Sequence, residues 1–259
     1  MKAFRSPVRE HMNPTVFTIG RGASLEEADL EMSRQMVSGL VVVDDRDSPV
    51  GVISRTDLLR AGRAIHAPDG GGSVNLNERL VVDDLFHSDP VSVGADATLE
   101  EAARLMGKRH VHRLMVEQDA RPVGMLSVTD LLRTVASSAA DTPVSELASE
   151  SIAHVAPDDT VAHAMDRLTA AGVRGLVVMQ DGWPVGALTQ QEALAAQQAG
   201  GDARVEDWMS PAVVCIPEST PLHRACAQAV AMHAPLMVTL QDQKPRGVLT
   251  PTDLIFAIM

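Results

Sequence analysis

A phrase of eleven residues that occurs four times constrains this chain of 259 residues more than any other feature. Each copy has proline first, glycine third, serine or threonine sixth and a carboxylate ninth. The copies span 49–59, 122–132, 184–194 and 245–255, so their glycines lie 73, 62 and 61 residues apart. A chain that repeats one unit near a fixed period consists of stacked copies of one supersecondary element. The sequence therefore predicts four equivalent units, with the polar residues of the phrase at the same place in each.

The second copy and its flanks predict the internal order of the unit most clearly. A short extended stretch at 91–93 is followed by Thr98 and Glu101, which form a capping-box pattern before an apolar stripe at 99–106. Residues 111–116 and 123–128 are rich in β-formers and are separated by a turn at 118–122. Thr129 and Asp130 then open a second helix. The predicted order is strand, helix, strand, strand, helix, which is a mixed α/β (α+β) fold.

The other copies fit the same order, with some local differences. Ser24 with Glu27 repeats the capping box, and Thr160 and Thr220 are predicted caps whose box partner is a histidine. The first spacing is longer because of residues 64–77, which contain three consecutive glycines and are expected to be a mobile loop. A small, polar stretch at 137–143 is the candidate boundary between two halves, 1–138 and 139–259, with repeats at about 6–62, 79–136, 141–198 and 202–259.

Composition excludes several classes of function. The net charge of −12 and 2% aromatic residues argue against a broad nucleic-acid surface, although a local basic pocket remains compatible with them. No apolar run reaches the roughly 20 residues of a membrane span, and the first residues lack the apolar core of a secretory signal. The two cysteines have no CxxC spacing, which favours a reduced, cytoplasmic setting.

Several motifs together resemble the cystathionine β-synthase (CBS) domain. They are Met-x-Pro at 12–14 and 209–211, His-Arg-Leu at 112–114, and the Gly-x-x-Ser/Thr-x-x-Asp core of the repeated phrase. The resemblance covers nearly the whole chain, from about Ser6 to Ile258. Such domains occur in pairs called Bateman modules, so four copies imply two modules in a stand-alone regulatory protein. In this family, the cleft between paired repeats binds adenosine compounds such as AMP, ADP, ATP or S-adenosylmethionine.

The repeated residues suit that chemistry. An aspartate can accept hydrogen bonds from both ribose hydroxyls, and a serine or threonine three residues earlier can donate to a phosphate. Free backbone N–H groups at the start of the helix also favour an anion, and apolar strand residues can flank the adenine.

The resemblance implies one candidate site in each of the first two repeats. In the second repeat, Ser127 and Asp130 match the phosphate and ribose positions, with Val91 beside the adenine and His112 and Arg113 as phosphate partners. The alternative there is a solvated basic edge and an ordinary helix cap at Ser127 or Thr129. In the first repeat the matching residues are Ser54, Arg55, Asp57, Val16 and Gly39. The alternative for Arg55 is a surface arginine on a loop.

The last two repeats depart from this pattern. In the fourth, Thr250 and Asp253 match, with Val213 near the base, but Pro235 and Leu236 replace His-Arg. Its phosphate support is thinner, which suggests a nucleoside-type ligand or an empty site. The third repeat has Glu192 in place of aspartate and lacks Met-x-Pro, so it is expected to be structural.

The sequence favours a non-enzymatic regulator that senses adenosine compounds; the alternative is a ligand-free scaffold for dimerisation or protein docking. An enzyme is disfavoured because no catalytic constellation recurs, and Cys226 beside His223 is more typical of a core cysteine than of a nucleophile. His110 and His112 lack a third metal ligand nearby in sequence. No resident cofactor or metal is expected. The predicted partners are the adenosine ligand, a second copy in a homodimer, and a regulated protein in trans, but no membrane.

Overall fold

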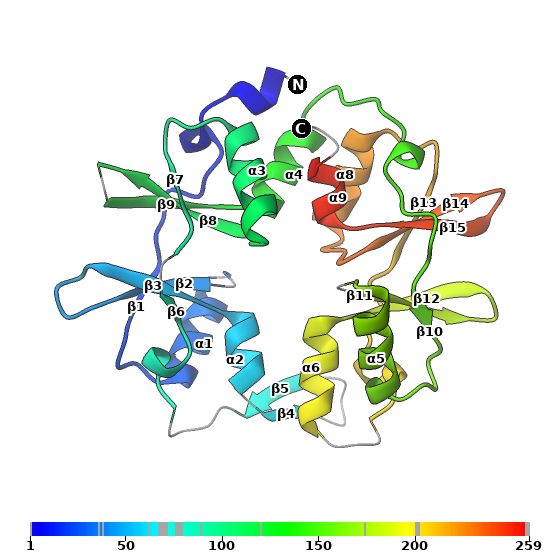
Figure 1. Ribbon diagram of the computed structural model, residues 1–259, viewed down its shortest axis with the longest axis horizontal. Coiled ribbons are helices and arrows are strands. Elements are labelled where there is room, and N and C mark those ends of the chain that lie inside the picture. Colours follow the sequence, from blue (N-terminus) through cyan, green and yellow to red (C-terminus); the bar gives the residue numbers. More distant parts are fainter. Residues whose placement is uncertain are drawn as a thin grey trace.

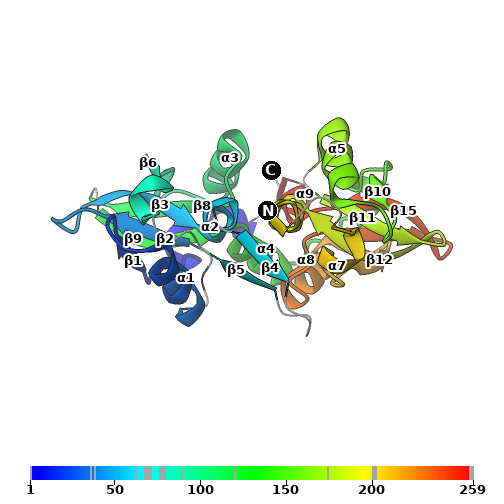
Figure 2. The ribbon, with the colours of Figure 1, turned by 90° about the horizontal axis from the view of Figure 1, so that it is seen from below.

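Two pairs of repeats lie side by side in the computed structural model of the chain (Figure 1). The structure describes residues 2–35, 37, 39–61, 63–66, 72–75, 80–88, 90–119, 121–173, 175–199 and 203–256. The first and second repeats, here called the first pair, form one half, and the third and fourth repeats, the second pair, form the other. Turned by 90°, the molecule is flat and elongated (Figure 2).

The second repeat has the predicted order of elements. It consists of β7 (Ser92–Gly94), α3 (Leu99–Arg109), β8 (Arg113–Gln118), β9 (Arg121–Ser127) and α4 (Val128–Ala136). β7 pairs in parallel with β8, and β8 pairs antiparallel with β9. A parallel pair needs a crossover connection, and α3 supplies it. The prediction of a mixed α/β unit is therefore confirmed.

The other repeats have the same plan. The first contains β1 (Thr18–Gly20), α1 (Leu25–Arg34), β2 (Gly39–Val43), β3 (Pro49–Ser54) and α2 (Arg55–Ala61), and β6 (His87–Ser88) joins its sheet. The third contains β10 (His154–Val155), α5 (Val161–Ala171), β11 (Gly175–Gln180), β12 (Trp183–Thr189) and α6 (Gln190–Ala199). The fourth contains α7 (Val205–Trp208), β13 (Val214–Pro217), α8 (Leu222–Ala231), β14 (Met237–Gln241), β15 (Lys244–Leu249) and α9 (Pro251–Phe256). Among the described residues, no helix is long and apolar enough to cross a membrane.

Three of the four predicted caps on the first helices are present. Ser24 with Glu27 and Thr98 with Glu101 form capping boxes, and the Thr160 hydroxyl accepts a bond from the His163 N–H. The prediction for Thr220 is wrong, because α8 begins at Leu222 and the cap position is Pro221, which makes no side-chain cap bond. The threonine lies one residue too early to reach the free N–H groups of the helix.

The residues that lengthen the first spacing form a hairpin. β4 (Arg63–His66) and β5 (Gly72–Asn75) pair antiparallel, and β4 lies against α6 of the second pair. The expected mobile loop over 64–77 is therefore wrong for these strands, while residues 67–71, 76 and 77 lie outside the described part of the chain. Pairing and contact with α6 supply a stabilisation that a local argument from glycine content omits.

Each repeat begins with a segment, here called its arm, that precedes its first strand (β1, β7, β10 or β13). The arm packs on the other member of the pair. Val8, in the first repeat's arm, belongs to the core of the second repeat, and Val82, in the second repeat's arm, belongs to the core of the first. In the second pair, Val144 in the third repeat's arm belongs to the core that includes the fourth repeat. Val205 in the fourth repeat's arm belongs to the core of the third. This exchange ties the two members of each pair together.

One hydrophobic core spans the two pairs. Residues of α4 in the second repeat pack with residues of α8 and α9 in the fourth, as the close approach of these helices at the top of Figure 1 shows. The first and third repeats instead have separate cores. The two halves are thus joined most firmly through the second and fourth repeats.

Candidate functional site

A cavity of about 390 Å³ lies where the second, third and fourth repeats meet. The fourth repeat contributes Thr250, Asp253 and Phe256, and the third repeat's arm contributes Ser151 and Ala153. The far wall comes from the other half of the molecule, where the lining residues include Met106, Gly107, His110 and His112. The walls are mainly apolar, with a few polar groups near Thr250, which is the usual character of a small-ligand site.

Asp253 caps the start of α9 with one of its two oxygens. Its Oδ2 atom accepts hydrogen bonds from the Thr250 N–H and hydroxyl, both at 2.7 Å. Among the described residues, nothing pairs with Oδ1. Because the first oxygen fixes the carboxylate in place, the second can accept a hydrogen bond from a ligand without losing the cap.

The other three carboxylates of the repeated phrase also accept bonds from the serine or threonine three residues earlier. Asp57 accepts from Ser54 and Asp130 from Ser127, and Glu192 of the third repeat accepts from Thr189 in the same manner. The two aspartates of the first pair differ from Asp253, because the second oxygen of each is already paired. Asp57 Oδ1 lies 2.9 Å from His87 Nε2, and Asp130 Oδ1 lies 2.7 Å from Arg133 Nη1.

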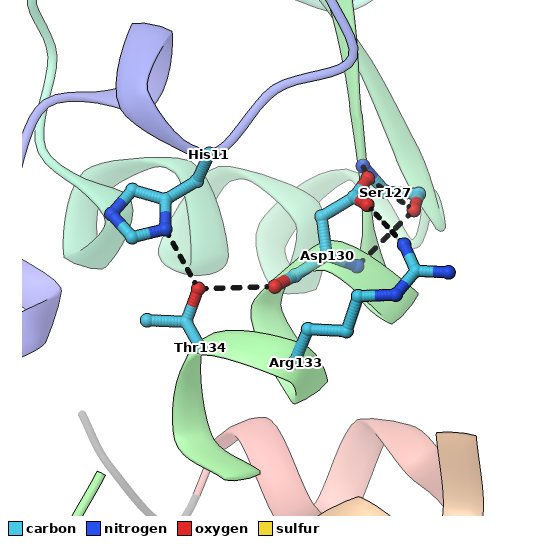
Figure 3. A network of polar contacts seen from close by, with 5 residues as sticks. All are labelled: His11, Ser127, Asp130, Arg133 and Thr134. Carbon is cyan, nitrogen blue, oxygen red and sulfur yellow. Dashed lines mark hydrogen bonds and ion pairs between the residues drawn. The ribbon is translucent and has the colours of Figure 1, made fainter. Parts of the chain in front are cut away.

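Figure 3 shows the surroundings of Asp130. Its backbone carbonyl accepts a bond from the Thr134 hydroxyl at 3.1 Å, and that hydroxyl oxygen lies 2.9 Å from His11 Nδ1. Since the hydroxyl proton is donated to the carbonyl, His11 Nδ1–H is the donor in the second bond. The network links the arm of the first repeat to α4. The polar contacts around Asp130 are thus made by groups of the protein itself.

The two predicted arginines lie away from the cavity. Arg113 is half-buried, and its guanidinium would come within 2.9 Å of a Cβ atom at Gly39, across the first pair. Burial lowers the pKa of Arg113, and the charge of Asp130 opposes that effect. Arg55 lies over α1, with Nη1 3.4 Å from Asp29 Oδ1 and Nη2 3.3 Å from the Ser33 hydroxyl.

A second, more polar cavity of about 680 Å³ adjoins the first. It is lined by Thr189, Glu192, Ser210 and His233. The two cavities share part of their walls, namely His110, His112, Gly175, Thr250 and Thr252. The sequence suggested a structural role alone for the third repeat, yet its phrase lines this cleft. No group of three potential metal ligands is assembled anywhere in the described residues.

The predicted adenine-flanking valines have other surroundings. Val213 packs against the cluster of Val177, Ala187, Leu236 and Val238. It does not line the cavity at Thr250, where Ala153 lies instead. Val91 accepts a bond from the Met115 N–H, and Val16 is half-buried in the first repeat's arm. The sequence-based pairing joined each valine to the carboxylate of its own repeat, whereas the arms cross to the partner repeat.

Cys226 is buried in the core shared by the two pairs. Burial raises the pKa of its thiol to about 12, so the thiolate that a nucleophile requires is scarce near neutral pH. His223 Nδ1 lies 2.9 Å from the Ala140 carbonyl. This arrangement favours the core interpretation of Cys226.

Comparison with known proteins agrees with the repeated architecture. The CBS domain model matches residues 8–64, 82–137, 144–199 and 205–259. An uncharacterised 33.4 kDa protein of Thermofilum pendens is 22% identical over 93% of this chain and 87% of its own length. Protein MJ1225 of Methanocaldococcus jannaschii is 27% identical over 53% of this chain and only 45% of its own length.

The crystal structure of one of these relatives shows the same fold. The crystal structure of MJ1225 aligns with a TM-score of 0.75 at 16% identity, covering 98% of this chain and 100% of that one. A CBS domain protein of Pyrobaculum aerophilum, solved in complex with AMP, aligns with a TM-score of 0.41 at 23% identity over 48% of this chain and 89% of that one. The AMP is a property of that protein.

Proposed function

The chain belongs to the CBS domain family, with four copies of the domain, and from this premise we propose that it is a non-enzymatic regulator that binds an adenosine compound. The proposed site is the cavity at Thr250 and Asp253. The observation that carries the proposal is the second oxygen of Asp253, held in place by the cap and lacking a partner among the described residues.

The arrangement suits a nucleoside. The carboxylate can accept hydrogen bonds from ribose hydroxyls, and such bonds to a charged group contribute about 1.5–3 kcal/mol each. Apolar residues such as Ala153 and Phe256 can flank a purine ring. The volume of about 390 Å³ lies within the usual range of small-ligand pockets.

The charges of the site favour ligands with few phosphates. The described residues that line the cavity include no lysine or arginine, and their only basic side chains are His110 and His112. A triphosphate would therefore meet little fixed positive charge near neutral pH. We expect adenosine, AMP or S-adenosylmethionine to bind more tightly than ATP.

Isothermal titration with these four compounds at pH 7.5 tests the proposal. The substitution Asp253→Asn keeps a carbonyl oxygen for the cap and replaces the other oxygen by a donor. It should weaken adenosine binding by about 10–100-fold, because a charge-assisted bond is lost. Asp166→Asn, an exposed position on α5 that lines neither cavity, is the control and should bind as the parent chain does. Equal affinity in both variants would reject the site.

A scaffold role is a second candidate, favoured for the first pair alone. The second oxygens of Asp57 and Asp130 are paired with His87 and Arg133, so a ribose at either site would have to displace one of these side chains. We therefore propose one adenosine site per chain and a structural role for the first pair. A titration stoichiometry near one supports this division, while two or more sites, or no binding at all, would contradict it.

A further inference from the structure

A polar cavity of about 190 Å³ lies between the third repeat's arm and the sheet of the fourth repeat. It shares no lining residue with the two cavities of the central cleft. The arm, the residue Glu218 before α8, and the strands β14 and β15 all contribute to it. The lining residues are Ser145, Ala148, Glu150, Glu218, Thr239, Gln241, Arg246 and Gly247.

The cavity lies where the other repeats have a large side chain. In those three repeats the arm places a methionine or phenylalanine over the glycine of the repeated phrase, namely Met12, Phe86 and Met209. In the fourth repeat the residue at this place is Ala148, four positions after Val144. Met12 lies at the same distance after Val8. The small side chain at this one crossing leaves room for a small molecule.

A buried hydroxyl borders this space. The residue opposite the phrase glycine is a buried valine in the other three repeats, namely Val42, Val116 and Val178. In the fourth repeat it is Thr239, which is 1% exposed. A Cβ atom at Gly247 would lie 3.0 Å from its hydroxyl oxygen, so the hydroxyl is on the side of the arm. Within the part of the chain that the structure describes, no group hydrogen-bonds to this hydroxyl.

That hydroxyl points to a bound partner. A buried polar group without a hydrogen bond destabilises the fold, whereas a valine of nearly the same shape does not. The fourth repeat nevertheless has threonine where its three equivalents have valine. A ligand in the cavity would supply the missing hydrogen bond.

Charged groups of both signs line the same cavity. Arg246 occupies the second position of the repeated phrase, which is valine in the other three copies. Glu150 of the arm and Glu218 supply two carboxylates. None of these three side chains forms an ion pair with another described residue. A guanidinium suits a carboxylate, and carboxylates suit an ammonium group with its three donors, so the cavity is complementary to a small zwitterion.

We infer that this cavity binds a small α-amino acid, with its carboxylate at Arg246, its ammonium group at Glu150 and Glu218, and the Thr239 hydroxyl as a further hydrogen-bonding group. The volume lies below the roughly 300–1,000 Å³ of sites for larger ligands, which restricts the amino acid to one with a small side chain. The site is separate from the adenosine site, so neither proposal depends on the other. A molecule bound here contacts both the arm and the sheet, and so holds the two members of the second pair together.

Thermal unfolding and titration calorimetry with glycine, L-alanine and L-serine at millimolar concentration test the inference. At least one of them should raise the melting temperature, because a ligand of the native state stabilises it. Each is compared with the two analogues that lack one of its charged groups, such as propionate and ethylamine for alanine. These analogues should bind at least about tenfold more weakly, because a charge-assisted bond is lost. No stabilisation by any of the three amino acids, or equal affinity for an analogue, overturns the inference.

Substitutions on β14 and β15 assign the site. Thr239→Val should raise the melting temperature of the free protein, because the unpartnered hydroxyl is removed, and should weaken amino-acid binding by about tenfold. Arg246→Gln should weaken it by about 10–100-fold through loss of the guanidinium. Lys244→Gln is the matched control, since it removes the same charge from an exposed position of β15 that does not line the cavity. It should bind as the parent chain does.

Filling the cavity gives an independent check. Ala148→Met restores the type of side chain that Met12 and Met209 place over the other phrase glycines, so it should abolish amino-acid binding and leave the adenosine affinity unchanged. Amino-acid binding that persists in full in Thr239→Val or in Ala148→Met overturns the site. Loss of adenosine binding in the parent chain would overturn the proposed function alone.

Discussion

The four glycines of the repeated phrase are required by close packing. A Cβ atom at Gly124 would lie 2.6 Å from the Asn13 carbonyl oxygen and 2.6 Å from Met12 Sδ. At Gly186 it would lie 2.7 Å from Met209 Sδ, and at Gly247 it would lie 2.7 Å from the Ser149 carbonyl oxygen. Each of these contacts is with the arm of the partner repeat. The glycine therefore marks where the arm crosses the sheet.

The substitution Gly124→Ala should destabilise the fold by about 1–3 kcal/mol, because the arm must shift to admit the methyl group. Gly94→Ala is the matched control, since a Cβ atom there meets nothing within 4 Å. Thermal melting of the two variants checks the expectation. Equal melting temperatures would contradict it and would mean that the arm shifts without loss of stability.

The same residues show where sequence reasoning succeeds and where it stops. The serine or threonine and the carboxylate three positions later were predictable, because the cap they form is local and follows from the start of a helix. The apolar lining of the cavity at Thr250 and Asp253 was not predictable, because part of it comes from the arm of another repeat. Ala153 lines this cavity from about a hundred residues earlier, and no local pattern indicates that placement.

At the scale of elements, the helices and strands followed from hydrophobic period and capping signals. These signals are carried by neighbouring residues, so the order of α3, β8, β9 and α4 was predictable from sequence. The β4–β5 hairpin was not predictable from sequence, since it depends on contact with α6 in the other half of the molecule. Tertiary contact there outweighs the low strand preference of glycine.

Two apparent helix caps should respond differently to the same substitution. Ser24→Ala removes a capping-box hydroxyl and should cost about 0.5–2 kcal/mol. Thr220→Ala should change stability by less than about 0.5 kcal/mol, because the Thr220 side chain caps no helix. Melting temperatures measured side by side check the difference. A larger effect at Thr220 would contradict the assignment of the cap position to Pro221.

At the scale of the whole molecule, the shared core makes the two halves interdependent. The second and fourth repeats bury a common set of apolar side chains across α4, α8 and α9. Among the described residues, α2 and the hairpin strand β4 contact α6 and so join the first repeat to the third. The two halves are thus packed extensively at the top of Figure 1, the fixed side, and less extensively at the bottom. A ligand beside α3 and α9 would act close to the fixed side, where the halves meet.

Separate production of residues 1–138 and 139–259 tests this interdependence. Each half alone would expose the apolar surface of α4, or of α8 and α9, that is covered by the other half in the whole chain. Exposed apolar patches of this kind promote association. We expect each half to self-associate and the mixture to form a 1:1 complex with a higher melting temperature than either half, as measured by light scattering and thermal unfolding. Halves that stay monomeric and melt at the same temperature alone and mixed would show that the shared core contributes little, because stabilisation by a partner must raise the melting temperature of the complex.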